Sequence, residues 1–171
     1  MSALNTDGGT SLTPQQVAEA VRVGMYAVDR ATQSLGITID AISPGGATLR
    51  MTVRPDMLNG LAGCHGGLIT TLADSAFAFA CNSYNELTVA SGLTIELMAP
   101  AREGDVLVAE ASEVSRLGRL GLYDVVVTNQ RGEEAPAAHS RKRERSLFPG
   151  RRPIRLSLAC ERRERPRDKV R

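Results

Sequence analysis

The chain has 171 residues, enough for one compact domain with a substantial core. Hydrophobic residues make up 42% and Trp is absent, so we expect a globular core built mainly from aliphatic side chains. No stretch reaches the roughly 18–20 uncharged apolar residues of a membrane span. The first residues also lack the basic and apolar regions of a secretion signal. These features predict a cytoplasmic protein that does not enter a membrane.

The net charge of +2 combines two different kinds of sequence. Residues 1–140 carry 8 Arg, no Lys and 15 acidic residues, a net charge of −7, whereas residues 141–171 carry a net charge of +9. The three cysteines, Cys64, Cys81 and Cys160, have no metal-ligand spacing. We therefore expect reduced thiols and no metal site, and we treat the acidic body and the basic end separately.

The amino-terminal third predicts a helix followed by a hairpin. Residues 1–12 are polar and Gly-rich, and we expect them to be frayed. Thr13 is a suitable N-cap before Pro14, and apolar residues with a loose helical period continue to Val28. Alternating residues at 37–41 and 47–53 flank the turn sequence SPGG, which is typical of a two-stranded hairpin.

The middle of the chain predicts a loop, a central helix and three strands. Residues 57–66 read as a loop, and residues 67–84 have apolar side chains all round a helical wheel, with Asp74 as the only charge. Segments 87–98, 105–114 and 120–128 are rich in Val, Leu, Ile and Thr. This order predicts an α+β domain in which an antiparallel sheet wraps round one buried helix.

The loop and the start of the helix could support chemistry at a carbonyl group. Two glycines, Gly66 and Gly67, allow a ligand to approach the helix amino terminus, and the Gly66 N–H could bind an oxyanion. A carboxylate deep in an apolar helix should have a raised pKa, which suits Asp74 to act as a base or nucleophile. The alternative is that Asp74 only hydrogen-bonds a neighbour such as Ser75 and that His65 and the glycines serve the turn.

The spacing of Gly66 and Asp74 favours a catalytic dimer. Eight residues of helix separate these groups by about 12 Å along the axis, while both must lie within roughly 3 Å of a reacting centre. One chain cannot meet that requirement alone. Two antiparallel copies of the helix could, with Asp74 from one subunit and Gly66 from the other.

Several separated motifs resemble the hydroxyphenylacetyl-CoA thioesterase family of the PaaI type, which has the hot-dog fold. They are RPDMLNG at 54–60, CHGG at 64–67, LADSAFAFACNSYN at 72–85, TIELMAPAREGD at 94–105 and GLYDVVVTNQRG at 121–132. The resemblance covers about 100 residues. One position departs from the pattern, because family members often have His directly after the Asn-Gly pair and this chain has Leu61.

The resemblance implies hydrolysis of an acyl-CoA such as (hydroxy)phenylacetyl-CoA, in aromatic-acid degradation, without a cofactor. It implies a homodimer, often paired into a homotetramer, with sites across the dimer interface. By position, Asp74 would activate water or attack the thioester, the Gly66 N–H would polarise the carbonyl and His65 would help to position it. Asn59 would orient the water or the thioester.

The phosphates of coenzyme A call for basic residues, and Arg116 and Arg119 are our main candidates, with Arg102 behind them. The alternative is that each of these arginines is only a solvated turn residue.

Other residues and functions also have alternatives. Phe77 could line an acyl pocket or belong to the core. A catalytic Cys64 lacks a second base. From a different functional class, a non-catalytic acyl-CoA sensor with a DNA-touching basic tail remains an alternative, and a hydratase of the same fold is a weaker one.

The last part of the chain, residues 135–171, does not follow the resemblance. Pro136 falls where a last strand is expected, and we find no sustained period of 2 or 3.6 beyond it. Three explanations stay open: a basic arm for nucleic acid, a disordered extension, or an out-of-frame end that has lost the strand. We favour the third and expect nucleic-acid binding to be absent. The predicted thioesterase domain thus spans residues 13–134, followed by a basic tail.

Overall fold

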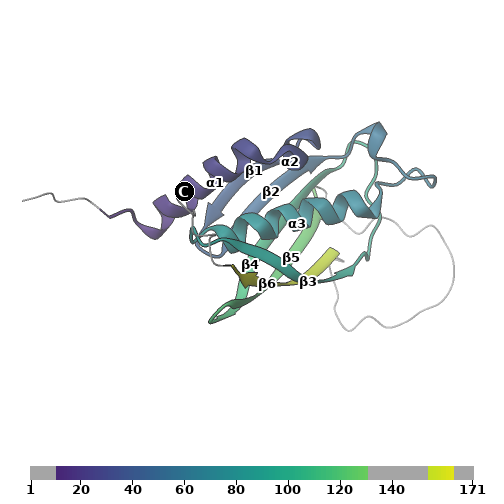
Figure 1. Cartoon of the computed structure of the whole chain (residues 1–171). Coiled ribbons are helices and arrows are strands. Elements are labelled where there is room, and N and C mark those ends of the chain that lie inside the picture. Colours follow the sequence, from purple (N-terminus) through teal and green to yellow (C-terminus); the bar gives the residue numbers. More distant parts are fainter. Residues whose placement is uncertain (1–10, 131–153, 164–171) are drawn as a thin grey trace, which may run out of the picture.

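The computed structural model describes residues 11–130 and 154–163, which form a sheet wrapped round a helix (Figure 1). The elements in chain order are α1 (Pro14–Val28), α2 (Arg30–Ser34), β1 (Thr38–Ser43), β2 (Gly46–Thr52), the 3₁₀ helix η1 (Pro55–Met57), α3 (Gly66–Asn82), β3 (Thr88–Glu96), β4 (Val106–Leu117), β5 (Leu120–Asn129) and β6 (Ile154–Arg162). The α+β architecture expected from the sequence is confirmed.

Local signals in the sequence account for the first helix. The Thr13 side chain accepts the Gln16 N–H at 3.3 Å, and the Gln16 side chain accepts the Thr13 N–H at 2.8 Å, which closes a capping box before Pro14. The short helix α2, which we did not predict, is capped by Asp29, whose carboxylate accepts the Thr32 N–H at 3.0 Å.

The six strands form one antiparallel sheet in the order β1-β2-β4-β5-β6-β3. Helix α3 crosses one face of this sheet, and α1 lies beside it over β1 (Figure 1). The core between helix and sheet is mainly aliphatic and includes the buried aromatic side chains of Phe77, Phe79 and Tyr123. Strands β1 and β3 are the two edges of the sheet.

The expectation that residues beyond Glu134 contain no strand is wrong. Strand β6 lies between β5 and β3 and pairs with both of them. Its sequence, IRLSLACER, alternates apolar and polar residues with the period of 2 that a half-buried strand requires. We missed it because it begins well beyond Pro136 and is surrounded by arginines. Its presence also removes the missing strand as an argument for an out-of-frame end, which the structure does not otherwise test. The rest of the predicted tail lies outside the described residues.

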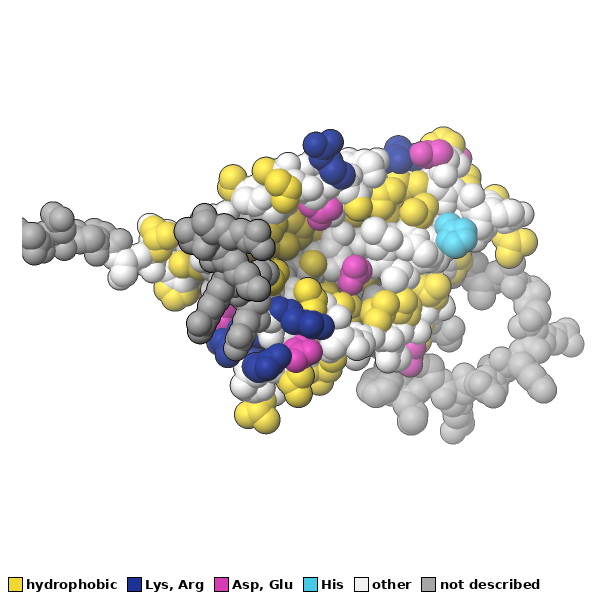
Figure 2. Space-filling model, viewed as in Figure 1, with side chains coloured by type: hydrophobic (Ala, Val, Ile, Leu, Met, Phe, Trp, Pro, Cys, Tyr) yellow, Lys and Arg dark blue, Asp and Glu magenta, His cyan; other side chains and the backbone are white. Residues whose placement is uncertain are grey.

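Helix α3 is also less enclosed than its composition predicts. The sheet covers the side that carries residues such as Leu72, Ala76 and Phe79, but Gly67 and Asp74 are exposed on the opposite side. Figure 2 shows this face of the molecule, where neutral and apolar side chains predominate and basic groups lie along the upper edge and at the lower left. The helix composition therefore reflects one face covered by the sheet and a second face without charge except at Asp74.

Candidate active site

The loop before α3 is closed by its own asparagine. The Asn59 Oδ1 atom accepts the N–H groups of Leu61 at 2.8 Å and Gly63 at 3.2 Å, while the Asn59 N–H donates to the Gly63 carbonyl at 2.7 Å. Leu61 projects outward and is 92% exposed. Among the described residues no acceptor binds the Asn59 Nδ2 group, which leaves this group as a donor next to the helix start.

His65 and Gly66 begin α3. His65 is the N-cap, and its Nδ1 atom accepts the Gly67 N–H at 3.1 Å. An accepting Nδ1 assigns the proton of the neutral ring to Nε2, which is then a donor. The Gly66 N–H has no partner in the part of the chain that the structure describes, and it lies at the positive end of the helix dipole. Three donors without a described acceptor, Asn59 Nδ2, His65 Nε2 and the Gly66 N–H, thus belong to the loop and the start of α3.

Gly66 lies directly beside the residue that follows β3. A Cβ atom added at Gly66 would approach Leu97 Cδ1 to 2.7 Å. This methyl group is the flexible end of a side chain that is 52% exposed, so it could move aside. The backbone before Gly66 is extended, with φ −62° and ψ 127° at His65. Glycine here keeps the N–H accessible between the loop and the end of β3.

Asp74 lies two turns further along α3. Its side chain is exposed in the single chain, yet the surrounding apolar groups displace enough water to raise its pKa above the ordinary value. Its neighbour Ser75 points the other way, to Thr32, with 3.1 Å between the two hydroxyl oxygens. Asp74 therefore is a free carboxylate rather than a structural hydrogen-bonding group, and the loop donors of the same chain are about 12 Å away along the helix.

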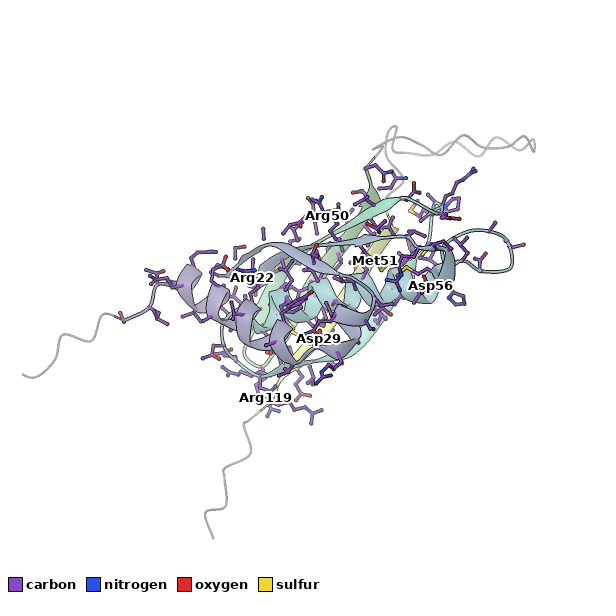
Figure 3. The ribbon with its side chains drawn as sticks, turned by 90° about the horizontal axis from the view of Figure 1, so that it is seen from above. Arg22, Asp29, Arg50, Met51, Asp56 and Arg119 are labelled. Carbon is purple, nitrogen blue, oxygen red and sulfur yellow. The ribbon has the colours of Figure 1, made fainter. Side chains whose placement is uncertain are left out.

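Within one chain, the structure does not bring Arg116 and Arg119 to the loop before α3. Arg116 stacks on the ring of Tyr84, just beyond the end of α3, at 4.0 Å from the ring centre. Arg119 pairs with Glu161 at 2.7 Å. Figure 3 shows Arg119 at the lower edge of the molecule, well apart from Asp56, which belongs to η1 just before the loop and lies on the right.

Arg102 has the better position of the three candidates. The carbonyl of its neighbour Ala101 accepts the Cys64 N–H at 2.8 Å, so the turn that carries Arg102 contacts the loop before α3. The Arg102 side chain is exposed. The sequence favoured Arg116 and Arg119 because they lie at a strand-turn-strand corner, whereas the contact between residues 64 and 101 leaves no local signal.

The cysteines and Phe77 belong to the interior. Burial, and secondarily the nearby Asp105 carboxylate, raises the pKa of the Cys64 thiol, which opposes a role as nucleophile. Burial raises the pKa of Cys81 to about 12. Phe77 is buried and packs edge-on against Tyr123 with ring centres 5.4 Å apart, so its role in the core is confirmed.

One helix enclosed by an antiparallel sheet defines the hot-dog fold, and here the fold carries donors at the helix start and a carboxylate on the free face of the helix. A family model described as the thioesterase superfamily matches residues 63–136. The acyl-coenzyme A thioesterase PaaI of Escherichia coli is 43% identical over 106 residues, or 62% of this chain and 76% of that protein. Acyl-coenzyme A thioesterase 13 of Homo sapiens is 30% identical over 96 residues, or 55% and 69% of the two chains.

The solved structures agree with these relatives. The E. coli PaaI protein from the phenylacetic acid degradation operon matches with a TM-score of 0.76 and 32% identity, over 89% of this chain and 97% of that chain. The chain belongs to the PaaI-type thioesterases of the thioesterase superfamily. It is therefore a thioester hydrolase, as the sequence motifs predicted.

Two kinds of feature are absent from the described residues. In residues 11–130 and 154–163 no helix is both long and apolar enough to cross a membrane. Within the same residues no three His, Cys, Asp or Glu side chains lie together as metal ligands would.

Proposed function

We propose that the protein hydrolyses aromatic acyl-CoA thioesters, of the (hydroxy)phenylacetyl-CoA class, to the free acid and coenzyme A in the cytoplasm. The relatives named above support the reaction, and their names include acyl-CoA thioesterase and phenylacetic acid degradation. The observation that carries the proposal is the free Asp74 carboxylate on an otherwise uncharged face of α3. The acyl-CoA sensor is disfavoured because the matched relatives are named as thioesterases.

Each active site combines two subunits. The exposed face of α3 carries Gly67, Asp74 and, partly covered, Thr71 and Ala78, all small enough for a second α3 to approach closely. The edge strand β3 has exposed apolar side chains at Val89 and Leu93, which a partner would cover. An antiparallel pair of α3 helices brings Asp74 of one subunit to the loop donors of the other. Two such dimers form the tetramer.

The chemistry follows from this pairing. The thioester carbonyl oxygen accepts the Gly66 N–H, which binds the negative charge that develops when the carbon is attacked. Asp74 either takes a proton from the attacking water or attacks the carbon itself. On the first route, collapse of the tetrahedral intermediate breaks the C–S bond, and the coenzyme A sulfur takes the proton that Asp74 removed from water. On the second route, collapse breaks the C–S bond and leaves an acyl–Asp74 anhydride, which water hydrolyses to the free acid and the Asp74 carboxylate, with one proton passing to the coenzyme A thiolate. His65 Nε2 and Asn59 Nδ2 orient the carbonyl and the water.

The phosphates of coenzyme A bind near the loop before α3, so the arginine of the same chain that lies beside this loop is considered first. Arg102 is the first candidate because its turn contacts the loop and its side chain is exposed. Arg116 and Arg119 are the weaker candidates, since both are already occupied by Glu86, Tyr84 or Glu161.

The direct test is the release of free thiol from phenylacetyl-CoA, followed with a thiol reagent. Hydrolysis is expected, and a folded protein that releases no thiol from any aromatic acyl-CoA would contradict the proposal. A single turnover in isotopically labelled water tests direct attack by Asp74. Label incorporated into the Asp74 carboxylate indicates direct attack followed by hydrolysis of the anhydride at the Asp74 carbonyl, whereas label confined to the acid product is expected both for general-base catalysis and for hydrolysis of an anhydride at the acyl carbon.

Subunit mixing tests the shared site. Asp74→Asn and Gly66→Pro are each expected to be inactive, but a mixed dimer has one site in which both groups are intact. Random mixing should restore about a quarter of the wild-type activity, because half the dimers are mixed and each has one intact site. If mixing restores no activity although mixed dimers form, both groups act within one chain and the cross-subunit site is wrong.

A further inference from the structure

The turn at residues 102–105 is closed by a buried carboxylate. The Asp105 N–H donates to the Arg102 carbonyl at 3.0 Å, and the Arg102 N–H donates to the Asp105 Oδ2 atom at 2.9 Å. Gly104 has φ +77°, the left-handed conformation that such a turn requires at its third residue. Asp105 is only 1% exposed. A buried carboxylate is costly unless its hydrogen bonds are made, so this one holds the turn in one conformation.

The same peptide group links the carboxylate to the catalytic loop. The Arg102 N–H and the Ala101 carbonyl belong to one planar peptide unit, whose two ends point in opposite directions. Its N–H end donates to Asp105, and its carbonyl end accepts the Cys64 N–H at 2.8 Å. A charged acceptor at the N–H end fixes the orientation of the plane and strengthens the hydrogen bond at the carbonyl end.

Cys64 is two residues before the proposed oxyanion donor. Successive N–H groups in this stretch have different acceptors: Cys64 donates to Ala101, and His65 donates to the Met57 carbonyl at 2.9 Å. The next N–H, that of Gly66, has no acceptor among the described residues. The direction of the Gly66 N–H therefore depends on the anchoring of the two residues before it.

We propose that Asp105 is a positioning residue, which aims the Gly66 N–H at the thioester oxygen through the Ala101–Arg102 peptide and the backbone of Cys64. The inference rests on the proposed function, because it names a further residue on which the same site depends. Asp105 does not touch the substrate. It acts on the rate because a donor that is misaimed by a fraction of an ångström loses stabilisation of the developing charge.

The test compares two substitutions of Asp105. Asp105→Asn keeps the shape and an oxygen acceptor but loses the charge, and we expect kcat to fall about three- to tenfold with KM within about twofold. Asp105→Ala removes the acceptor and should lower kcat further, by about 30-fold or more. An unchanged kcat in Asp105→Asn overturns the proposal, and this variant decides alone if Asp105→Ala does not fold.

A matched control separates positioning from loss of stability. The Ser83 hydroxyl is also buried, and it accepts the Gly45 N–H at 2.8 Å and donates to the Ala80 carbonyl at 2.7 Å, at the far end of α3. Ser83→Ala should lower the melting temperature and leave kcat unchanged. If Ser83→Ala and Asp105→Asn each lose kcat in proportion to the fall in melting temperature, Asp105 has only a structural role and the proposal is wrong.

Amide hydrogen exchange provides a readout that does not need substrate. In Asp105→Asn we expect faster exchange in the peptide that covers residues 61–68, and unchanged exchange in the middle of α3. An inactive wild-type protein would contradict the proposed function but leave this measurement valid. Equal exchange of residues 61–68 in both proteins overturns the positioning role whether or not the protein hydrolyses thioesters.

Discussion

The two ends of helix α3 differ in how their polar groups are satisfied. At the carboxyl end, the Asn82 side chain binds both the N–H and the carbonyl of Thr88, at 2.9 and 3.0 Å. Beyond it, Tyr84 and Tyr123 both donate to Glu113, at 3.1 and 2.8 Å. At the amino end, the donors at Gly66 and Asn59 have no described acceptor. The paired end holds helix and sheet together, whereas the unpaired end has donors available for a ligand.

The same contrast applies to the charged residues. Near the carboxyl end, Glu86 pairs with Arg162 at 2.9 Å and with Arg116 at 3.8 Å. Asp74 and Arg102, at the middle of α3 and beside its amino end, form no ion pair with any described residue. The proposed active-site region therefore has charged groups that are available to a ligand. The following predictions test this difference.

The largest effect is expected at Asp74. Asp74→Asn keeps the shape of the side chain but cannot act as a base or nucleophile, so kcat should fall by about two to four orders of magnitude. Binding of the substrate should persist, as measured by calorimetry with the variant. Asp124→Asn, on the outer face of the sheet where Ser157 donates to it at 2.9 Å, is the matched control and should retain full activity. Retained turnover in Asp74→Asn would contradict the catalytic role.

The next effect is expected when the Gly66 N–H is removed. Pro is well tolerated at the first position of a helix, and the extended backbone of His65 suits the residue before Pro. Gly66→Pro should lower kcat by about 100-fold relative to Gly66→Ala. The two variants introduce the same Cβ beside Leu97, so their difference isolates the N–H. Equal kcat values in thiol-release assays would show that this donor does not bind the oxyanion.

The pH dependence of kcat should reflect the raised pKa of Asp74. Burial raises the pKa of Asp74 from its ordinary value near 3.8, and the active form is the carboxylate. As the pH falls, kcat should therefore decline at a higher pH than it would for an ordinary Asp, and Asp74→Asn should lack this limb. A limb at or below the ordinary Asp value would contradict the raised pKa.

The free energy of unfolding should depend on pH in the opposite direction to kcat. A carboxyl group with a raised pKa binds its proton more tightly in the folded state, so stability falls as pH rises from the unfolded to the folded pKa. Asp74→Asn should melt at a higher temperature than the wild type at neutral pH, and the difference should vanish below the unfolded pKa. A lower melting temperature at neutral pH would show that Asp74 stabilises the fold instead.

Elements that are encoded by neighbouring residues could be predicted from the sequence, whereas an element that depends on distant partners could not. The capping box at Thr13, the hairpin at residues 38–52 and the motif around Gly66 are each encoded within a few neighbouring residues, and all were predicted. Strand β6 was missed because its partners, β5 and β3, are distant in sequence and its own alternation lies among arginines.

The expectation that α3 is buried on all sides was wrong for a related reason. A helical wheel shows which residues are apolar, but it does not tell whether the sheet of the same chain or another subunit covers them. The contact of Cys64 with Ala101 has no local pattern either, so the roles of Arg102 and Asp105 could be found only from the three-dimensional arrangement.

The smallest effect compares the arginines at the two ends. Arg102→Ala should raise KM for the acyl-CoA about threefold to tenfold with kcat unchanged, because it removes one contact to a phosphate. Arg119→Ala should leave KM unchanged, since its guanidinium already pairs with Glu161, and should alter stability by at most about 1 kcal/mol. Repeating both assays with the corresponding acyl-pantetheine, which lacks the nucleotide, should abolish the effect of Arg102→Ala. The reverse result, a raised KM for Arg119→Ala alone, would place the nucleotide at the carboxyl end of α3 and would contradict the division between a ligand-binding and a structural end.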